Sequence, residues 1–150
     1  MATNDAIQSR GTQKTIASSL SGTVANNAIS AVLTNAYSAT DTLGKPDAEF
    51  AAKLVFGANP TENTTVDLYV RPLNIHSTTV DTEVPTATYK PHYVCSFLVK
   101  GGATTTNAFG VGLNLPKEGE FYFFNNGTGQ TLQTTCELYM TPITLGPSAS

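Results

Sequence analysis

Apolar and polar residues alternate along the chain from about residue 48 onwards. In residues 48–56 and 65–72, every second position is apolar, which is the spacing at which strand side chains share one face. The same alternation recurs in 92–100, 108–116 and 132–145. These stretches predict strands whose core-facing residues are Phe50, Ala52, Leu54 and Phe56; Val66, Leu68 and Val70; Tyr93, Cys95, Phe97 and Val99; Phe109, Val111, Leu113 and Leu115; and Leu132, Thr134, Cys136, Leu138 and Met140.

Residues 120–126 (EFYFFNN) are apolar on both faces, which predicts a central strand that is covered on both sides. Gly and Asn residues at 57–61, 101–102 and 125–129 mark turns between the strands. Residues 73–91 contain two prolines and predict a long loop at one end of the sheet. Strands separated by turns, with no long amphipathic helix, predict an all-β fold, an antiparallel β-sandwich or jelly roll.

Residues 1–27 differ from the rest because their side chains are short and polar, with only scattered apolar residues. This composition predicts an extended N-terminal arm (1–27) attached to a jelly-roll domain (28–150). A frayed terminus is the alternative interpretation. The segment 15–20 (TIASSL) has the pattern to add a strand to a partner's sheet. Residues 25–37 fit either a short helix or a strand.

The overall charge narrows the classes of partner. Only 13% of the residues are charged, the net charge is −3, and the two arginines are Arg10 and Arg71. Because binding to phosphates needs clustered Lys and Arg, we expect no nucleic-acid partner. The N-terminus lacks the apolar core of a signal peptide, and no apolar run approaches the roughly 20 residues of a membrane span.

Candidate catalytic and metal sites are weak. The sequence contains no P-loop, no G-x-G-x-x-G and no G-x-S-x-G motif. His76 with Asp81 and Glu83 does not match the spacing of common metal motifs, and a solvated loop is preferred. Glu118 and Glu120 could form a carboxylate pair, but a solvated turn is preferred. We therefore predict no catalytic, cofactor-binding or metal site, and no enzymatic activity.

The two cysteines, Cys95 and Cys136, both fall on inward positions of predicted strands. We expect them to be buried and reduced, as small apolar residues; a disulfide is the alternative. Two glycosylation-like triplets begin at Asn63 and Asn126. Without a secretory signal, both are interpreted as turn chemistry.

Several runs carry a resemblance to a known group of proteins. They are ANNAIS (25–30), PDAEFAAKLVFGANPTENTTVDLYVRP (46–72), VDLYVRPLNI (66–75) and EFYFFNNGTGQTL (120–132). Together, over about residues 21–145, they resemble small virion proteins of tailed bacteriophages that are encoded near the capsid genes. The resemblance implies a jelly-roll cement or decoration protein on the capsid exterior. Its partners would be the major capsid protein and other copies of itself, as a homodimer or homotrimer.

The hypothesis from the sequence is therefore a structural virion protein, made in the cytoplasm of the host bacterium, whose arm reaches a neighbouring subunit. The resemblance carries over no individual functional residue. A phage tail component or a receptor- or carbohydrate-binding module is the alternative, with Tyr89 and Tyr93 as candidate sugar contacts. A cupin-like enzyme is a third reading, but it needs several metal ligands, and the chain has only two His.

Overall fold

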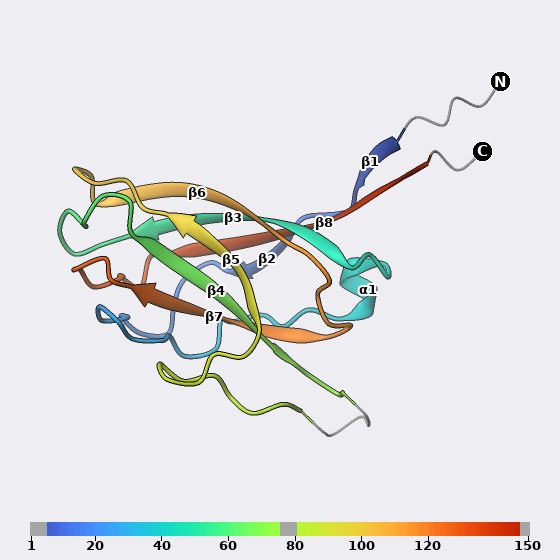
Figure 1. The fold of residues 1–150 in the computed structure, drawn as a ribbon, viewed down its shortest axis with the longest axis horizontal. Coiled ribbons are helices and arrows are strands. Elements are labelled where there is room, and N and C mark those ends of the chain that lie inside the picture. Colours follow the sequence, from blue (N-terminus) through green and yellow to red (C-terminus); the bar gives the residue numbers. More distant parts are fainter. Residues whose placement is uncertain (1–5, 76–80, 148–150) are drawn as a thin grey trace.

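The computed structural model describes residues 6–75 and 81–147 as two antiparallel β-sheets packed face to face (Figure 1). One sheet has the order β1-β8-β3-β6, with β2 also paired to β8, and the other has the order β5-β4-β7. The predicted all-β antiparallel sandwich is confirmed. The strands are β1 (Ala6–Arg10), β2 (Lys14–Ala17), β3 (Asp47–Val55), β4 (Thr65–Pro72), β5 (Tyr93–Leu98), β6 (Thr105–Gly112), β7 (Gly119–Asn126) and β8 (Glu137–Pro147).

The one helix in the described part of the chain, α1 (Ala39–Thr42), is a single turn before β3. The Asp41 carboxylate accepts a hydrogen bond of 2.8 Å from the backbone N–H of Ser38 and so caps its start. Leu43, in the left-handed region with φ 51°, ends it. No helix in the described ranges is long and apolar enough to cross a membrane.

Strand pairing is nested along the chain. The first strand pairs with the eighth, the third with the sixth, and the fourth with the fifth. The register of β3 against β6 runs without a shift from Ala48↔Gly112 to Val55↔Thr105. Between β4 and β5 the register shifts once, between Leu68 and Tyr69.

The core lies between the two sheets and is built from the predicted alternation. The inward residues that the pattern selects in β3, β4 and β8 and at Phe56, Leu132 and Cys136 beside them are buried. Thr134 is the exception: the prediction that it lines the core is wrong, because it lies exposed in the turn before β8.

Phe121 of β7 joins the sheets, because its ring lies 5.3 Å from that of Phe50 on the opposite sheet, edge to face. Phe97 and Phe123 form a second edge-to-face pair at 6.2 Å. The predicted interpretation of the cysteines as buried and reduced is also confirmed, since both are free and buried.

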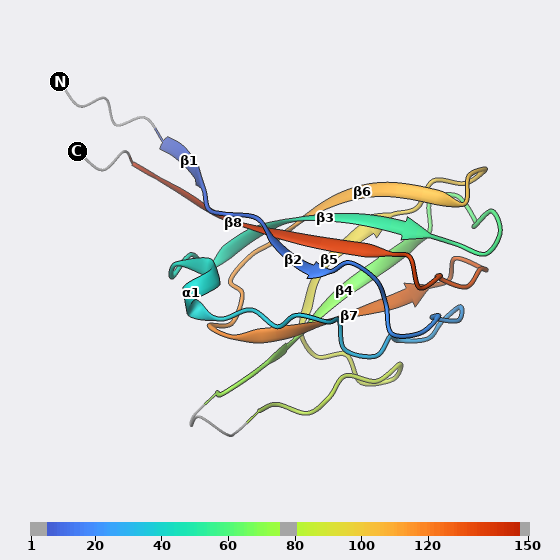
Figure 2. The same cartoon turned by 180° about the vertical axis from the view of Figure 1, so that it is seen from behind.

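The N-terminal segment is not an arm as far as residue 27. Strand β2 pairs with β8, and Ile16, Leu20 and Val24 are buried in the core. A few apolar side chains thus suffice to place residues 14–24 in the domain, and the boundary predicted at residue 27 is wrong. What projects is a two-stranded ribbon, made of β1 and the end of β8 (Figures 1 and 2).

Residues 25–37 form neither the helix nor the strand that the sequence left open. They run irregularly along the outer edge of β7 and bond to it at intervals. The backbone N–H groups of Ser30, Leu33 and Tyr37 donate to the carbonyls of Phe123, Phe121 and Gly119. The prediction that β7 is central is wrong, because β7 is the end strand of its sheet. The irregular segment closes its free edge.

Candidate functional site: the seam between two edge strands

Strands β5 and β6 are the end strands of their sheets and lie on the same side of the sandwich. Within the described ranges, β5 pairs only with β4, and β6 only with β3. The two strands come close together where β6 has glycines. A Cβ atom on Gly110 would lie 2.7 Å from Cys95 Sγ, and one on Gly112 would lie 2.6 Å from Val94 Cγ1. The bare face that these glycines leave on β6 is thus filled by side chains of β5.

The glycine face of β6 points inward, so its large side chains point outward. The side chains of Phe109 and Val111 are 60% and 41% exposed, and Leu113 just beyond the strand is 66% exposed. The prediction that these three residues line the core is wrong. The reason is steric, because the space beside β5 has no room for a Cβ. Leu115 is the one member of that set packed against the core.

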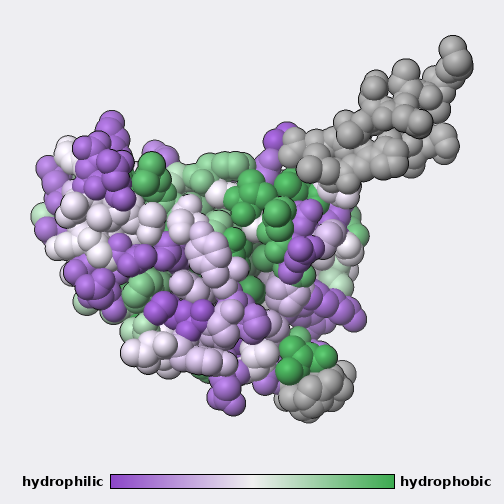
Figure 3. Space-filling view, in the orientation of Figure 1, coloured by the Kyte–Doolittle hydropathy of each residue, from purple (hydrophilic) through white to green (hydrophobic). Residues whose placement is uncertain are grey.

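Two residues of β5 extend the exposed surface. Leu98 is 60% exposed and Tyr93 is 57% exposed. The register shift in the pairing of β4 with β5 sets Tyr93 opposite Tyr69, out of the inward phase of Cys95 and Phe97. We call Tyr93, Leu98, Phe109, Val111 and Leu113 the apolar seam. Figure 3 shows hydrophobic atoms, in green, gathered on the face that carries β5 and β6.

The apolar seam carries no charge of its own. Neither β5 (YVCSFL) nor β6 (TTNAFGVG) contains a charged residue. At one end a shallow groove is lined partly by Glu62 and Lys100, and at the other a groove is lined partly by His92 and Asn114. An apolar centre with a polar rim is the arrangement of protein–protein interfaces.

Charges on the adjoining outer face of the large sheet are paired with one another. Arg10 binds Glu49 with an N–O distance of 2.8 Å, and Lys53 binds Glu137 at 3.1 Å. In register, Lys53 lies between Asn107 of β6 and Glu137 of β8, and its ion pair is made on the β8 side. On the side of the large sheet, the seam is therefore bordered by paired charges.

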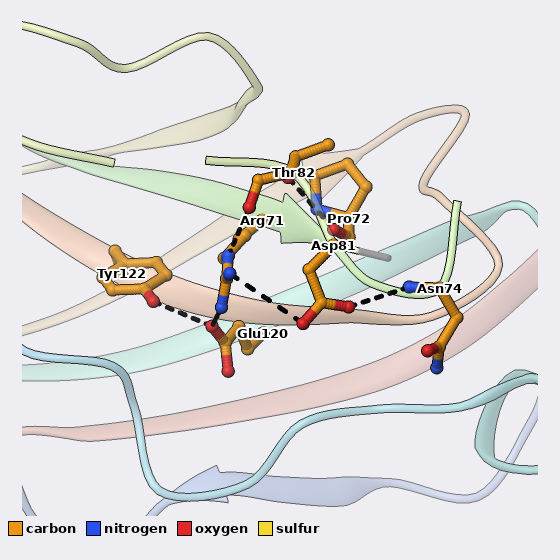
Figure 4. A network of polar contacts seen from close by, with 7 residues as sticks. All are labelled: Arg71, Pro72, Asn74, Asp81, Thr82, Glu120 and Tyr122. Atoms are coloured by element: carbon orange, nitrogen blue, oxygen red, sulfur yellow. Dashed lines mark hydrogen bonds and ion pairs between the residues drawn. The ribbon is translucent and has the colours of Figure 1, made fainter. Parts of the chain in front are cut away.

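A cluster of polar side chains surrounds Arg71 at the C-terminal end of β4 (Figure 4). Its guanidinium donates to Glu120 Oε1 at 2.8 Å and to the carbonyl of Thr82 at 2.8 Å, with Asp81 at 3.8 Å. These bonds raise the pKa of Arg71, chiefly through Glu120. Tyr122 also donates to Glu120 Oε1, and burial raises its pKa to about 12. The cluster anchors the loop after β4 to the sheet.

The structure assigns positions and partners to most of the candidate catalytic and metal-binding residues that the sequence suggested. His76 lies outside the described residues, and Asp81 is used by Arg71 and by the backbone N–H of Asn74. Glu118 accepts a hydrogen bond from Asn74, and Glu120 is part of the Arg71 cluster. The preferred interpretation of these two glutamates as a solvated turn is wrong for Glu120, which is in β7. Within the described ranges, no three His, Cys, Asp or Glu side chains are grouped to hold a metal.

Tyr89 and Tyr93, the candidate sugar contacts, are each about half exposed. The Tyr93 ring packs edge to face on Tyr69 at 5.9 Å, and its hydroxyl lies 2.8 Å from Ser96 Oγ. Ser96 in turn donates to the buried Asp67. Tyr93 thus has a fixed orientation at one end of the seam.

Sequence reasoning missed the seam because it assigned the larger residues of β6 to the core. The signal was present in the alternation of glycine with large residues at 109–113, which fits an edge strand pressed against a neighbour. No protein-family model, curated protein or solved structure matches the chain.

Proposed function

We propose that the chain is a structural virion protein without enzymatic activity. It binds the outer surface of a phage capsid and stabilises the lattice of the major capsid protein, as a cement or decoration protein. The sequence resemblance suggests this class of partner. The observation that carries the proposal is the projecting ribbon of β1 and the end of β8.

Beyond Ile143, no third strand among the described residues joins the ribbon. Its five pairs run from Arg10↔Ile143 to Ala6↔Pro147, and β3 begins opposite Ile143 with Asp47. A two-stranded ribbon is only marginally stable by itself, because it has little to pack against. Its unpaired edges offer N–H and C=O groups to a strand of another protein. A neighbouring capsid subunit completes such an element.

Two further features support the proposal. The nested strand pairing is the order in which a jelly roll is wound, with residues 24–37 in the place of a strand beside β7. Jelly rolls are frequent among capsid proteins, although fold alone does not decide function. The low charge limits repulsion between many copies, and weak contacts repeated on a lattice add up through multivalency.

The test is binding of a ribbon-truncated chain to capsids of the phage that encodes it. Removing residues 1–8 takes away most of β1 but keeps Arg10 with its partner Glu49. Removing residues 1–24 would be uninformative, because Ile16, Leu20 and Val24 belong to the core. We expect the short truncation to fold, by circular dichroism, and to cosediment with capsids at least about 10-fold more weakly.

Unchanged cosedimentation of the truncated chain would reject the role of the ribbon. A chain that carries Val32→Glu, an exposed residue of the 24–37 segment, is the matched control and should bind normally. Quantitative mass spectrometry of purified particles tests the class of protein. A lattice protein is present in many copies, whereas only a few copies would indicate a tail or vertex component.

A receptor- or carbohydrate-binding module is the second candidate. The favouring observation is the groove at the end of the seam, where Tyr93 lies with Pro91, His92 and Leu113. An oriented aromatic ring beside polar groups can stack on a sugar. A glycan array on which Tyr93→Ala abolishes a signal of the natural chain would support this function; an array without any signal would reject it.

A further inference from the structure

We infer that a second copy of this chain binds at the apolar seam, seam against seam, about a two-fold axis. The β6 strands of the two copies would run antiparallel at the contact. A two-fold contact is isologous, so one patch has to be complementary to itself. The inference depends on the seam alone and not on the capsid assignment.

Charge is the first argument for a second copy as the occupant. Strands β5 and β6 have no charged side chain, and the charges on the adjoining outer face of the large sheet are paired with each other. A strongly charged partner therefore gains nothing at the seam. A surface that matches it has to be equally neutral and apolar, and the chain's own seam meets this requirement.

The unguarded edge of β6 is the second argument. Natural edge strands are usually protected by Lys, Pro, a bulge or a covering segment. Strand β6 has no Lys or Pro, its register with β3 has no bulge, and the backbone hydrogen bonds found for its residues go to β3. The edge of β7, in contrast, is covered by residues 24–37. An edge that keeps neither kind of protection is suited to pairing with an identical edge.

Size is the third argument. Each of the five seam residues is between 41% and 66% exposed. Together these side chains expose on the order of 500 Å², with Phe109 and Val111 on the outer face of the large sheet and Leu98 and Tyr93 on that of the small sheet, to either side of the junction of β5 with β6. That is in the range of patches that mark interaction sites, and more than half of the roughly 800 Å² that each partner buries in a typical interface.

Strand order gives the geometry of such a dimer. Because β1 and β6 are at opposite ends of the order β1-β8-β3-β6, joining two copies at β6 places the two ribbons at the outer ends of the combined sheet. One dimer then presents two ribbons to separate neighbours.

The test is the sedimentation behaviour of the full chain at concentrations up to about 100 μM, which detects dimers of micromolar affinity. We expect a dimer for the natural sequence. Phe109→Glu and Leu113→Glu should each weaken it at least about 10-fold, because a charge would be buried without a partner. Val32→Glu, which adds the same charge to another exposed apolar position, should leave the dimer intact.

Hydrogen–deuterium exchange of the natural chain gives an independent measurement that needs no variant. Amides of β6 should become better protected as the concentration rises, while those of β1 should not. A natural chain that stays monomeric, a dimer that resists both substitutions, or a trimer would each overturn the inference. Capsid binding by a monomeric Phe109→Glu chain would leave the proposed function standing, so the two proposals fail separately.

Discussion

The two ends of the sheet β5-β4-β7 are finished in opposite ways. At the β7 end, residues 24–37 bond to the strand backbone and bury it. At the β5 end, glycines of β6 press against the strand without backbone hydrogen bonds among those described, and large apolar side chains stay exposed. One edge is closed with irregular chain, whereas the other is left open and apolar. The difference indicates that the open side is kept for contacts with other molecules.

The largest loss of stability should come from removing the buried ring of Phe121, at the edge of the sheet that residues 24–37 close. Phe121 stacks on Tyr37 of the closing segment at 5.2 Å and meets Phe50 at 5.3 Å. We expect Phe121→Ala to lower the free energy of unfolding by about 3–5 kcal/mol, because it removes a fully buried ring and leaves a cavity. Denaturant unfolding followed by circular dichroism measures this. Phe124→Ala, on the partly exposed face of the same strand, should cost clearly less; equal losses would contradict the comparison.

On the open side, the close approach of β6 to β5 is the sensitive feature. We expect Gly110→Val to lower the free energy of unfolding by about 2–3 kcal/mol, because its side chain would overlap Cys95. This steric cost exceeds the strand preference of valine. Gly22→Val is the matched control, since nothing lies within 4 Å of that site. Thermal unfolding of both variants checks the prediction, and a Gly110→Val chain as stable as the control would refute it.

A single hydroxyl tests how the closing segment holds β7. Ser30 Oγ accepts a hydrogen bond of 3.0 Å from the backbone N–H of Phe123, and the Ser30 side chain is buried. We expect Ser30→Ala to cost about 1–2 kcal/mol, because the Phe123 N–H loses its acceptor without gaining water. Hydrogen exchange at Phe123 should accelerate. Ser21→Ala, at an exposed position, should change stability by less than about 0.5 kcal/mol; a similar loss there would argue against the edge contact.

The smallest effect should come from pH, and it concerns the thiol beneath Gly110. Burial, with a contribution from Asp67, raises the pKa of Cys95 to about 12 from 9.0. The unfolded chain therefore loses this proton first, so the stabilisation is complete below pH 9 and declines as the pH rises towards 12. The loss at pH 9 should be only about 0.5 kcal/mol.

Melting temperatures between pH 7 and pH 9 measure this decline. In the Cys95→Ala chain, the fall in melting temperature from its value at pH 7 should be smaller than in the natural chain. A profile that is unchanged by the substitution would show that the thiol is not the titrating group.

Most of the sandwich follows from alternation in the sequence, and the exceptions have physical causes. The pattern identified the core faces of β3, β4 and β8, such as Phe50, Leu68 and Leu138, because the apolar residues of each strand that face the other sheet are buried. It failed at β6, because hydrophobicity assigns Phe109 to the core whereas sterics reserve the inner face for Gly110. A pattern of apolar residues contains no information on the space available to a Cβ.

The N-terminal region and the candidate site were harder for a different reason. Ile16 and Val24 are isolated apolar residues, and their burial depends on where β8 and residue Leu132 lie in space. The pairing of Arg71 with Glu120 likewise joins residues 49 positions apart. Such contacts depend on topology, which a local pattern does not determine.

The pairing of Ala6 with Pro147 has a mechanical consequence. Tension applied to the two ends of the chain would pull across the ribbon and load one pair of strands from its open end. Hydrogen bonds loaded in this way break one after another at low force, unlike bonds sheared together along a strand. The ribbon would therefore separate as far as Gly11 and Pro142 before the force reaches the sandwich. Its opening would lengthen the chain while the core stays folded.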